Sequence, residues 1–338
     1  MLSNRISMSA GMIISYAKLI ATILIWGGVY HVAKFLVGEV DVYTVSFVRF
    51  FLASSVLLLM YFAYGRKSIS VMAINKQQWW LLLCSGGVGI FLYNLFFFNA
   101  ERLIAANNVV VIYSFTPCLT VILCKMVFKT KVSFLAWCGI GIALFGTIMA
   151  VAFASTDSPP ASVMSPLTKS VKILGYNASD SYLRQIVGEA CAVAAAICMA
   201  IFNIINKKAS AAALDTLTIT TFSSLFGGIM LAVCYSFYGE PIAKVVLMPW
   251  SFWWAMGYTA ILATVFCYKW YSDAIKDIGV GQTAIFLNGV SLSTILIGVV
   301  VLHQPVHYFI LIAGGLIVCG VLITNIAVTK GNSGCEAV

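Results

Sequence analysis

Two ionisable side chains, His31 and Lys34, lie inside an apolar run that extends from about residue 13 to residue 37. Their spacing of three residues places them on one face of a helix. Arg49 and Glu189 are ionisable side chains within two later apolar runs. Burying Lys or Arg at mid-bilayer costs about 2.5–3.5 kcal/mol on insertion scales, so such residues face the protein interior and serve substrates, protons or ion pairs. We expect these four side chains to form a mainly cationic cluster.

Each of these four residues also has a purely structural interpretation. Lys34 could extend its long side chain to the outer surface. Arg49 could clamp neighbouring carbonyl groups or Glu101, and His31 could be a packing histidine. Glu189 and His31 are the candidates for a proton-coupled group, although an ion pair of Glu189 with Arg49 or Lys34 is equally open.

A second set of candidates consists of aromatic and amide side chains inside the apolar runs. Such side chains either join helices by hydrogen bonds or bind a polar substrate. With His31, Lys34 and Arg49, the substrate-binding candidates are Trp26, Tyr30, Tyr93, Asn94, Asn108, Tyr113, Asn203 and Asn288. Pro117 lacks a backbone donor and should bend its helix, which makes it the candidate hinge.

The elements that carry these residues are expected to be membrane-spanning helices. Of 338 residues, 62% are hydrophobic and 9% are charged, against roughly a quarter charged in soluble domains. Lys and Arg occur singly or in pairs, without the basic cluster that nucleic-acid binding requires. The ten cysteines are scattered without a C-x-x-C spacing. We therefore expect an integral membrane protein with no nucleic-acid partner, no metal and no other cofactor.

Apolar stretches of about 20 residues predict ten transmembrane helices. They cover residues 14–37, 43–64, 78–99, 103–127, 132–154, 185–206, 216–238, 250–272, 278–302 and 306–328. The distribution of Lys and Arg among the loops favours cytoplasmic termini, in a bacterial inner (plasma) membrane. In this orientation the four ionisable side chains lie in the outer half, and Glu101 with Arg102 belongs to a short outside loop.

The two halves of the chain match one another at a constant offset of 174 residues. Lys34 matches Lys208, Asp41 matches Asp215 and Gly146 matches Gly320. Each half has five predicted helices, an odd number, so the second half must enter the membrane from the opposite side. We expect residues 14–154 and 185–328 to be two inverted-topology five-helix repeats, with 155–184 as an external linker. Inverted repeats predict alternating access to a site near the midplane.

Several short motifs also occur in a fixed order. They are Trp26-Gly27 with Lys34, Asp41 with Arg49, Pro117, Gly141 with Gly146, and Asn206-Lys207-Lys208. With these motifs the chain resembles, over about residues 14–328, the ten-helix exporters of the drug/metabolite transporter superfamily with two EamA-type domains. It departs from the family's Gly-Glu after helices four and nine, where it has residues 128–131 and 302–305, and from the family's second proline, where it has Ser291.

The expected function is secondary export of a small polar or zwitterionic metabolite, such as an amino acid, by alternating access. The cationic cluster could receive the carboxylate of such a substrate. No G-x-x-x-x-G-K-[ST] motif occurs, so ATP is not the direct energy source, and proton coupling and facilitated diffusion both stay open. The alternative is an uptake carrier for an organic cation or a nucleoside-like compound. No H-E-x-x-H or G-x-S-x-G motif supports an enzyme. The expected partners are the substrate, the lipid bilayer and protons, in a monomer or a homodimer.

Overall fold

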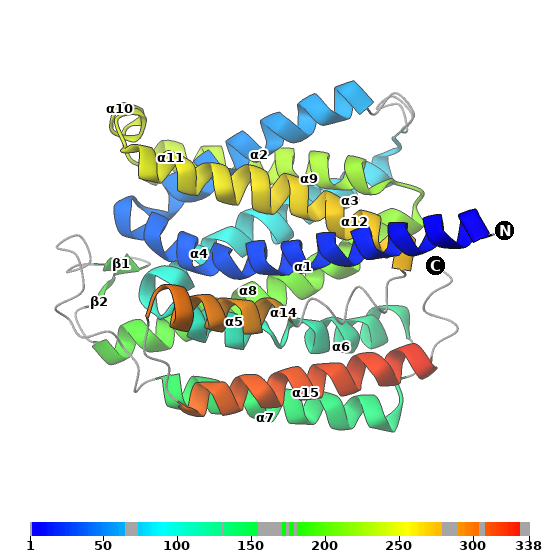
Figure 1. Ribbon diagram of the computed structural model, residues 1–338. Helices are drawn as coiled ribbons and strands as arrows, with labels where there is room; N and C mark the ends of the chain where they lie inside the picture. The colour runs from blue at the N-terminus through cyan, green and yellow to red at the C-terminus, as the bar shows by residue number, and fades with distance from the viewer. Residues whose placement is uncertain are drawn as a thin grey trace.

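The computed structural model describes residues 2–64, 74–129, 132–154, 171–173, 176–178, 181–278, 289–303 and 308–331. These residues form a bundle of long helices that run side by side (Figure 1). Each of the ten apolar stretches predicted from the sequence has a helical counterpart there. The predicted all-helical membrane fold is confirmed.

The first half of the chain crosses the bundle five times. Helix α1 covers Leu2–Glu39 and α2 covers Val42–Tyr64. The third crossing consists of α3 (Lys76–Ser85), the π-helix η3 (Gly86–Leu92) and α4 (Tyr93–Leu103). The fourth crossing is interrupted, with α5 (Ala106–Tyr113) followed by α6 (Thr116–Phe128), and the fifth is α7 (Phe134–Ala154).

The second half follows a short antiparallel hairpin of β1 (Val171–Ile173) and β2 (Tyr176–Ala178), in which Val171 pairs with Ala178. Its first two crossings are α8 (Ser181–Ala211) and α9 (Thr216–Tyr238), followed by the short α10 (Ile242–Val246). The next crossing consists of α11 (Trp250–Gly257), η6 (Tyr258–Phe266) and α12 (Cys267–Ile278). The last two contain α14 (Gly289–Leu296) with η7 (Ile297–Val301), and α15 (Tyr308–Gly331).

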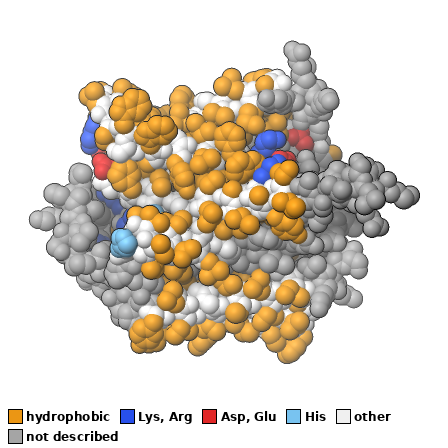
Figure 2. Space-filling model, in the orientation of Figure 1, with side chains coloured by type: hydrophobic (Ala, Val, Ile, Leu, Met, Phe, Trp, Pro, Cys, Tyr) orange, Lys and Arg blue, Asp and Glu red, His pale blue; other side chains and the backbone are white. Residues whose placement is uncertain are grey.

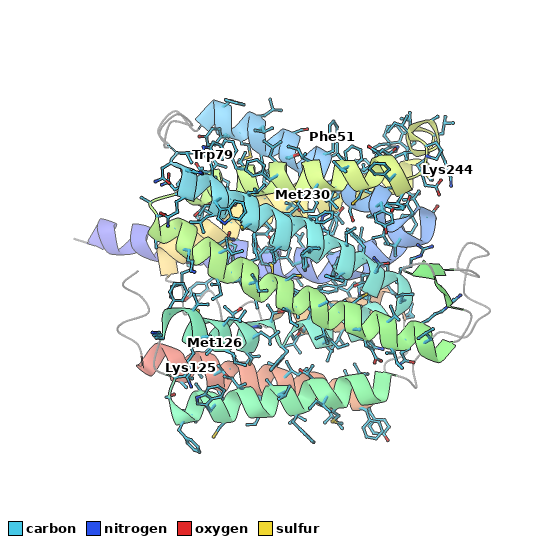
Figure 3. The ribbon with its side chains drawn as sticks, turned by 180° about the vertical axis from the view of Figure 1, so that it is seen from behind. Phe51, Trp79, Lys125, Met126, Met230 and Lys244 are labelled. Carbon is cyan, nitrogen blue, oxygen red and sulfur yellow. The ribbon has the colours of Figure 1, made fainter. Side chains whose placement is uncertain are left out.

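The surface of the bundle is suited to lipid. Seven helices in the described part of the chain are long and apolar enough to cross a membrane, and two shorter apolar helices cover Phe134–Met149 and Gly289–Val301. Apolar side chains follow the helices over the face in Figure 2, whereas the charged side chains visible there lie toward the two ends. Phe51 is 57% exposed and Met126 is 70% exposed, and both project from the bundle (Figure 3). The chain is an integral membrane protein.

The same local structures recur in both halves at the 174-residue offset. Asp41 accepts hydrogen bonds from the amide and the hydroxyl of Thr44, at 2.9 and 2.5 Å, and Asp215 accepts the same two from Thr218, at 2.9 and 2.7 Å. Adding 174 to the bounds of η3 gives 260–266, which lies within η6. The first helices of the two halves, α1 and α8, run in opposite directions (Figure 1). The two repeats are therefore inverted.

Small residues let the last helices of the two repeats pack together. A Cβ atom on Gly139 of α7 would lie 2.6 Å from the carbonyl oxygen of Gly320 in α15, and one on Gly320 would lie 2.5 Å from the carbonyl oxygen of Gly139. A Cβ atom on Gly141 would meet nothing within 4 Å. The contact between α7 and α15 therefore depends on Gly139 and Gly320, and Gly141 lies outside it.

Candidate functional site

Arg49 lies in the interior of the bundle, where α2 carries it between aromatic rings. Its guanidinium carbon is 5.5 Å from the ring centroid of Phe50 and 5.8 Å from that of Phe98. Its Nη2 donates a hydrogen bond to the hydroxyl of Thr264 at 3.4 Å, and its Nε has no hydrogen-bond partner among the described residues. A guanidinium has five N–H donors. Arg49, which is 9% exposed, therefore has donors available for a ligand.

Two tyrosines, one from each half of the chain, interact electrostatically with Arg49. They are Tyr93 and Tyr268. Tyr93 is the first residue of α4, directly after η3, and Tyr268 is the second residue of α12, after η6. A π-helix closes its turns five residues apart instead of four, which rotates the face of the helix that follows, and π-helical turns are frequent at functional sites. Each of the two π-helices thus directly precedes the helix that carries one of these tyrosines.

The two tyrosines belong to a central aromatic cluster, which we define as Trp26, Tyr30, Tyr93, Tyr113, Tyr268 and Tyr271. The ring centroid of Tyr113 is 6.3 Å from the ring centroid of Tyr30 and 6.0 Å from that of Tyr93. The ring centroid of Trp26 is 5.6 Å from that of Tyr268 and 5.7 Å from that of Tyr271. The indole of Trp26 also donates to the carbonyl of Ala263 at 2.8 Å. The ring contacts of the cluster therefore form two groups, one that joins α1, α4 and α5 and one that joins α1 to α12.

Sequence reasoning named four members of this cluster and missed two. Trp26, Tyr30, Tyr93 and Tyr113 are the expected substrate-binding residues; the rings of the three tyrosines contact one another through Tyr113, and Trp26 contacts Tyr268. Tyr268 and Tyr271 were missed, although their spacing of three residues places both on one face of α12. The repeat contained a further signal, because Tyr93 plus 174 gives position 267, the residue before Tyr268.

The fourth crossing is interrupted where Pro117 predicts a bend. Pro117 has no N–H to donate to the carbonyl of Tyr113, four residues earlier. The hydroxyl of Thr116 donates to that carbonyl instead, at 2.5 Å. At the same interruption the hydroxyls of Ser114 and Ser291 form a hydrogen bond, which joins α5 to α14. The fourth and ninth helical crossings thus meet at this interruption, while the hinge role of Pro117 stays a prediction.

His31 connects α1 to α14. Its Nε2 lies 2.8 Å from the carbonyl oxygen of Thr294. A carbonyl can only accept, so Nε2 carries the hydrogen, and Nδ1 of the neutral ring is then an acceptor. Neither this Nδ1 nor the Oδ1 of Asn107 has a hydrogen-bond partner within the described ranges. Both residues border Gly298, where a Cβ atom would lie 3.1 Å from Oδ1 of Asn107 and from Cε1 of His31.

Lys34 does not extend to the surface, which was one of the alternatives. Its ammonium group donates to the backbone carbonyls of Glu101 and Ile104, at 2.5 and 2.6 Å. Glu101 was expected in an outside loop, and this was wrong: α4 continues to Leu103, so Glu101 lies within the helix and is 0% exposed. Sequence reasoning did not name Glu101 as a candidate. The available signal was its spacing of four residues from Phe97 and eight from Tyr93, which places all three on one helix face.

The remaining candidates have separate partners. Glu189 of α8 accepts a hydrogen bond from Gln185 at 2.9 Å. Among the described residues, no ion pair joins Glu189 to Arg49 or Lys34. The structure therefore gives His31, Lys34, Arg49 and Glu189 four different sets of partners, and does not assemble them into the expected cluster.

The amide candidates are dispersed as well. Asn94 donates to the carbonyl of Ile90 in its own helical crossing at 2.6 Å, and Asn203 of α8 donates to the hydroxyl of Thr120 at 3.3 Å. Asn108 is buried near the start of α5, and Asn288 lies outside the described residues. Three or more potential metal ligands gather nowhere in the part of the chain that the structure describes.

Comparison with known proteins places the chain in a family. The model of the EamA-like transporter family matches residues 13–152 and again 186–326. The chain is 25% identical over 308 residues to the uncharacterized transporter YyaM of Bacillus subtilis (strain 168), covering 91% of this chain and 92% of YyaM. It is also 25% identical over 315 residues to the uncharacterized transporter YetK of the same strain, covering 92% and 87%. A solved crystal structure shares its fold, with a TM-score of 0.60 and 19% identity over 96% of this chain and 99% of that one. The chain is a membrane transporter that belongs to the EamA-like transporter family.

Proposed function

We propose that this transporter is a secondary exporter of a small zwitterionic metabolite of the amino-acid class, and that Arg49 binds the substrate carboxylate. The observation that carries the proposal is the arginine itself. It is buried, and its Nε has no hydrogen-bond partner in the described part of the bundle. An unpaired buried charge is costly in a membrane protein, and such residues mark substrate or ion pathways. A carboxylate would supply the missing partner.

An arginine at position 49 binds a carboxylate with better geometry than a lysine at the same position would. The rings of Phe50 and Phe98 lie near the guanidinium and hold it in place by cation–π attraction. The planar fork of a guanidinium forms two parallel hydrogen bonds to a carboxylate, which fixes the orientation of the bound group. Tyr93 and Tyr268 are further polar residues that interact electrostatically with the same cation.

The central aromatic cluster also supports a second interpretation, uptake of an organic cation or a nucleoside-like compound. The ring centroid of Trp26 lies 5.6 Å from that of Tyr268 and 5.7 Å from that of Tyr271. Such rings attract cations and stack on bases. The positive charge of Arg49 disfavours a simple cation at this place, whereas a zwitterion satisfies both the guanidinium and the rings. We therefore favour the amino-acid class.

Alternating access follows from the inverted repeats. The site is built from α1, α2, α4 and α5 of the first repeat and from α12 of the second, so rocking of one repeat against the other would open it to either side. We propose residues 14–154 and 185–328 as the two moving units and 155–184 as an external linker. Cytoplasmic termini and a bacterial inner membrane complete the proposal, with export driven by a proton gradient.

The experiment that tests this function is counterflow in proteoliposomes. Purified protein is reconstituted, and exchange of radiolabelled neutral amino acids, choline and uridine is measured against empty vesicles. We expect exchange of at least one amino acid. Arg49→Gln should lower it about tenfold to a hundredfold, because hydrogen bonds to a charged group contribute about 1.5–3 kcal/mol.

Two further variants distinguish a specific effect at Arg49 from the general effect of removing a surface charge. Arg49→Lys keeps the charge and loses the fork, so it should fall between wild type and Arg49→Gln. Lys244→Gln removes a half-exposed cation that pairs with Glu240 at 2.9 Å, and should leave exchange unchanged. Exchange of choline or uridine without any amino acid would overturn the proposal in favour of the alternative. Equal exchange in wild type and Arg49→Gln would remove Arg49 from the site.

A further inference from the structure

The end of α4 is held by a side chain from another helix. The last carbonyls of a helix have no partner within it and form the negative end of the helix dipole. Here the ammonium group of Lys34 in α1 donates to the carbonyl of Glu101 in the last turn and to that of Ile104, the extended residue after the helix, at 2.5 and 2.6 Å. We call these two hydrogen bonds the Lys34 latch. The latch connects the first and third crossings of the first repeat.

Glu101 lies in the same helical turn. Its backbone carbonyl accepts a hydrogen bond from Lys34, whereas its side-chain carboxyl group does not. The residue is 0% exposed, and neither carboxyl oxygen has a hydrogen-bond partner among the residues that the structure describes. Lys34 is its cationic neighbour, but no ion pair within 4.0 Å joins them in the described ranges. An ionised carboxylate without donors is very costly to bury, whereas a protonated one is far less so.

We infer that Glu101 carries the coupled proton of the transport cycle and that its charge state controls the Lys34 latch. With the proton on Glu101, the ammonium group of Lys34 stays on the carbonyls of Glu101 and Ile104. When Glu101 ionises, its O–H bond breaks and the proton passes to water, and the ammonium group of Lys34 leaves the two carbonyls to donate a hydrogen bond to the carboxylate. Reprotonation of Glu101 reverses the step. This inference rests on the proposed proton-driven export.

The surroundings of Glu101 allow such a switch. Tyr30 of α1 and Tyr93 of α4 are the other titratable groups that interact with it electrostatically. On the remaining packed elements, Arg49 of α2 is held over Phe50 and Phe98, and Glu189 of α8 accepts from Gln185. Lys34 is thus the cation whose hydrogen bonds would change when the charge of Glu101 changes.

The switch belongs to one repeat alone. Lys208 matches Lys34 at the 174-residue offset, but it is exposed and lies 5.9 Å from the ring centroid of Phe128. Position 275, which matches Glu101, is an isoleucine. A carboxyl group occurs at this place in the first repeat and not in the second, so the mechanism requires one proton per cycle.

Hydrogen–deuterium exchange of the full-length protein in lipid nanodiscs tests this inference without a substrate. The readout is the peptide that contains the amide of Ile104, which donates to the carbonyl of Ala100 at 2.9 Å beneath the latch. After correction for intrinsic exchange, the wild type should exchange about tenfold faster at alkaline than at acidic pH, because the latch opens when Glu101 ionises. Glu101→Gln should stay protected at both pH values, and Glu189→Gln should behave as the wild type.

Lys34→Met provides a second, independent arm, with rapid exchange expected at both pH values. A wild-type protein whose exchange does not depend on pH would overturn the inference. So would pH dependence that persists in Glu101→Gln or in Lys34→Met. Since no substrate takes part, these results stand apart from a failure of amino-acid exchange in the proteoliposome assay.

Discussion

Asp41 and Asp215 occupy equivalent positions in the two repeats, and each begins the second helix of its repeat by accepting hydrogen bonds from a threonine three residues on. Asp41 has a further role, because its Oδ2 accepts from the backbone amide of Glu240 at 3.1 Å. Thr44 accepts from the same amide at 2.9 Å. The cap of α2 therefore also attaches the first repeat to the loop that follows α9.

Removal of this cap gives the first prediction. Asp41→Ala should lower the free energy of unfolding by about 0.5–2 kcal/mol, because the first turn of α2 loses its acceptor. Asp41→Asn, whose side chain is also a good cap, should cost much less. Denaturant titration of both variants in mixed micelles measures the difference. Equal stability of Asp41→Ala and the wild type would show that the cap contributes little.

A pair of glycines in α7 gives the second prediction. Gly139→Ala would place Cβ 2.5 Å from the hydroxyl of Thr324 and 2.6 Å from the carbonyl oxygen of Gly320, so α7 and α15 must separate. We expect a loss of about 1–3 kcal/mol, the usual cost of overpacking. Gly141→Ala is the matched control: it has open space around it and should be neutral or slightly stabilising. Similar melting temperatures of the two variants would contradict the packing described above.

The sequence predicts the helices of this protein well, because apolar length and repeated spacing are local signals. The inverted repeat is also readable, since Asp41 and Asp215 keep both their identity and their role as caps. The sequence predicts the site less well. Lys34 was recognised as unusual, but its partners are carbonyl groups 67 and 70 residues away, and backbone acceptors leave no trace in residue types.

Glu101 illustrates a different reason for the incomplete prediction of the site. Two charged residues side by side, Glu101 and Arg102, are typical of a loop, and the helix boundary was placed accordingly. Packing of α4 against α1 and α8 keeps the helix intact to Leu103 and buries the carboxyl group. Tertiary contacts thus override a local polarity signal, and local polarity alone cannot report on them.

The third prediction concerns the interruption of the fourth crossing. Pro117→Ala restores an N–H that can donate to the carbonyl of Tyr113 and compete with the hydroxyl of Thr116, which now occupies it at 2.5 Å. We expect the helix to become straighter and transport turnover to fall several-fold, while thermal stability is retained or raised. Counterflow rates together with melting temperatures test this. Unchanged turnover in Pro117→Ala would exclude a hinge role for Pro117.

The fourth prediction separates the structural role of His31 from a role in proton coupling. The ring holds α1 to α14 through the carbonyl of Thr294, so His31→Ala should lower the free energy of unfolding by about 0.5–1.5 kcal/mol. His31→Gln retains an N–H donor of similar reach and should recover most of that loss. Because Glu101 is the inferred proton site, His31→Gln should also keep the pH dependence of amino-acid exchange. If exchange in His31→Gln becomes independent of pH while folding is preserved, His31 and not Glu101 carries the proton, and its Nδ1, which has no hydrogen-bond partner among the described residues, is then the atom that binds it.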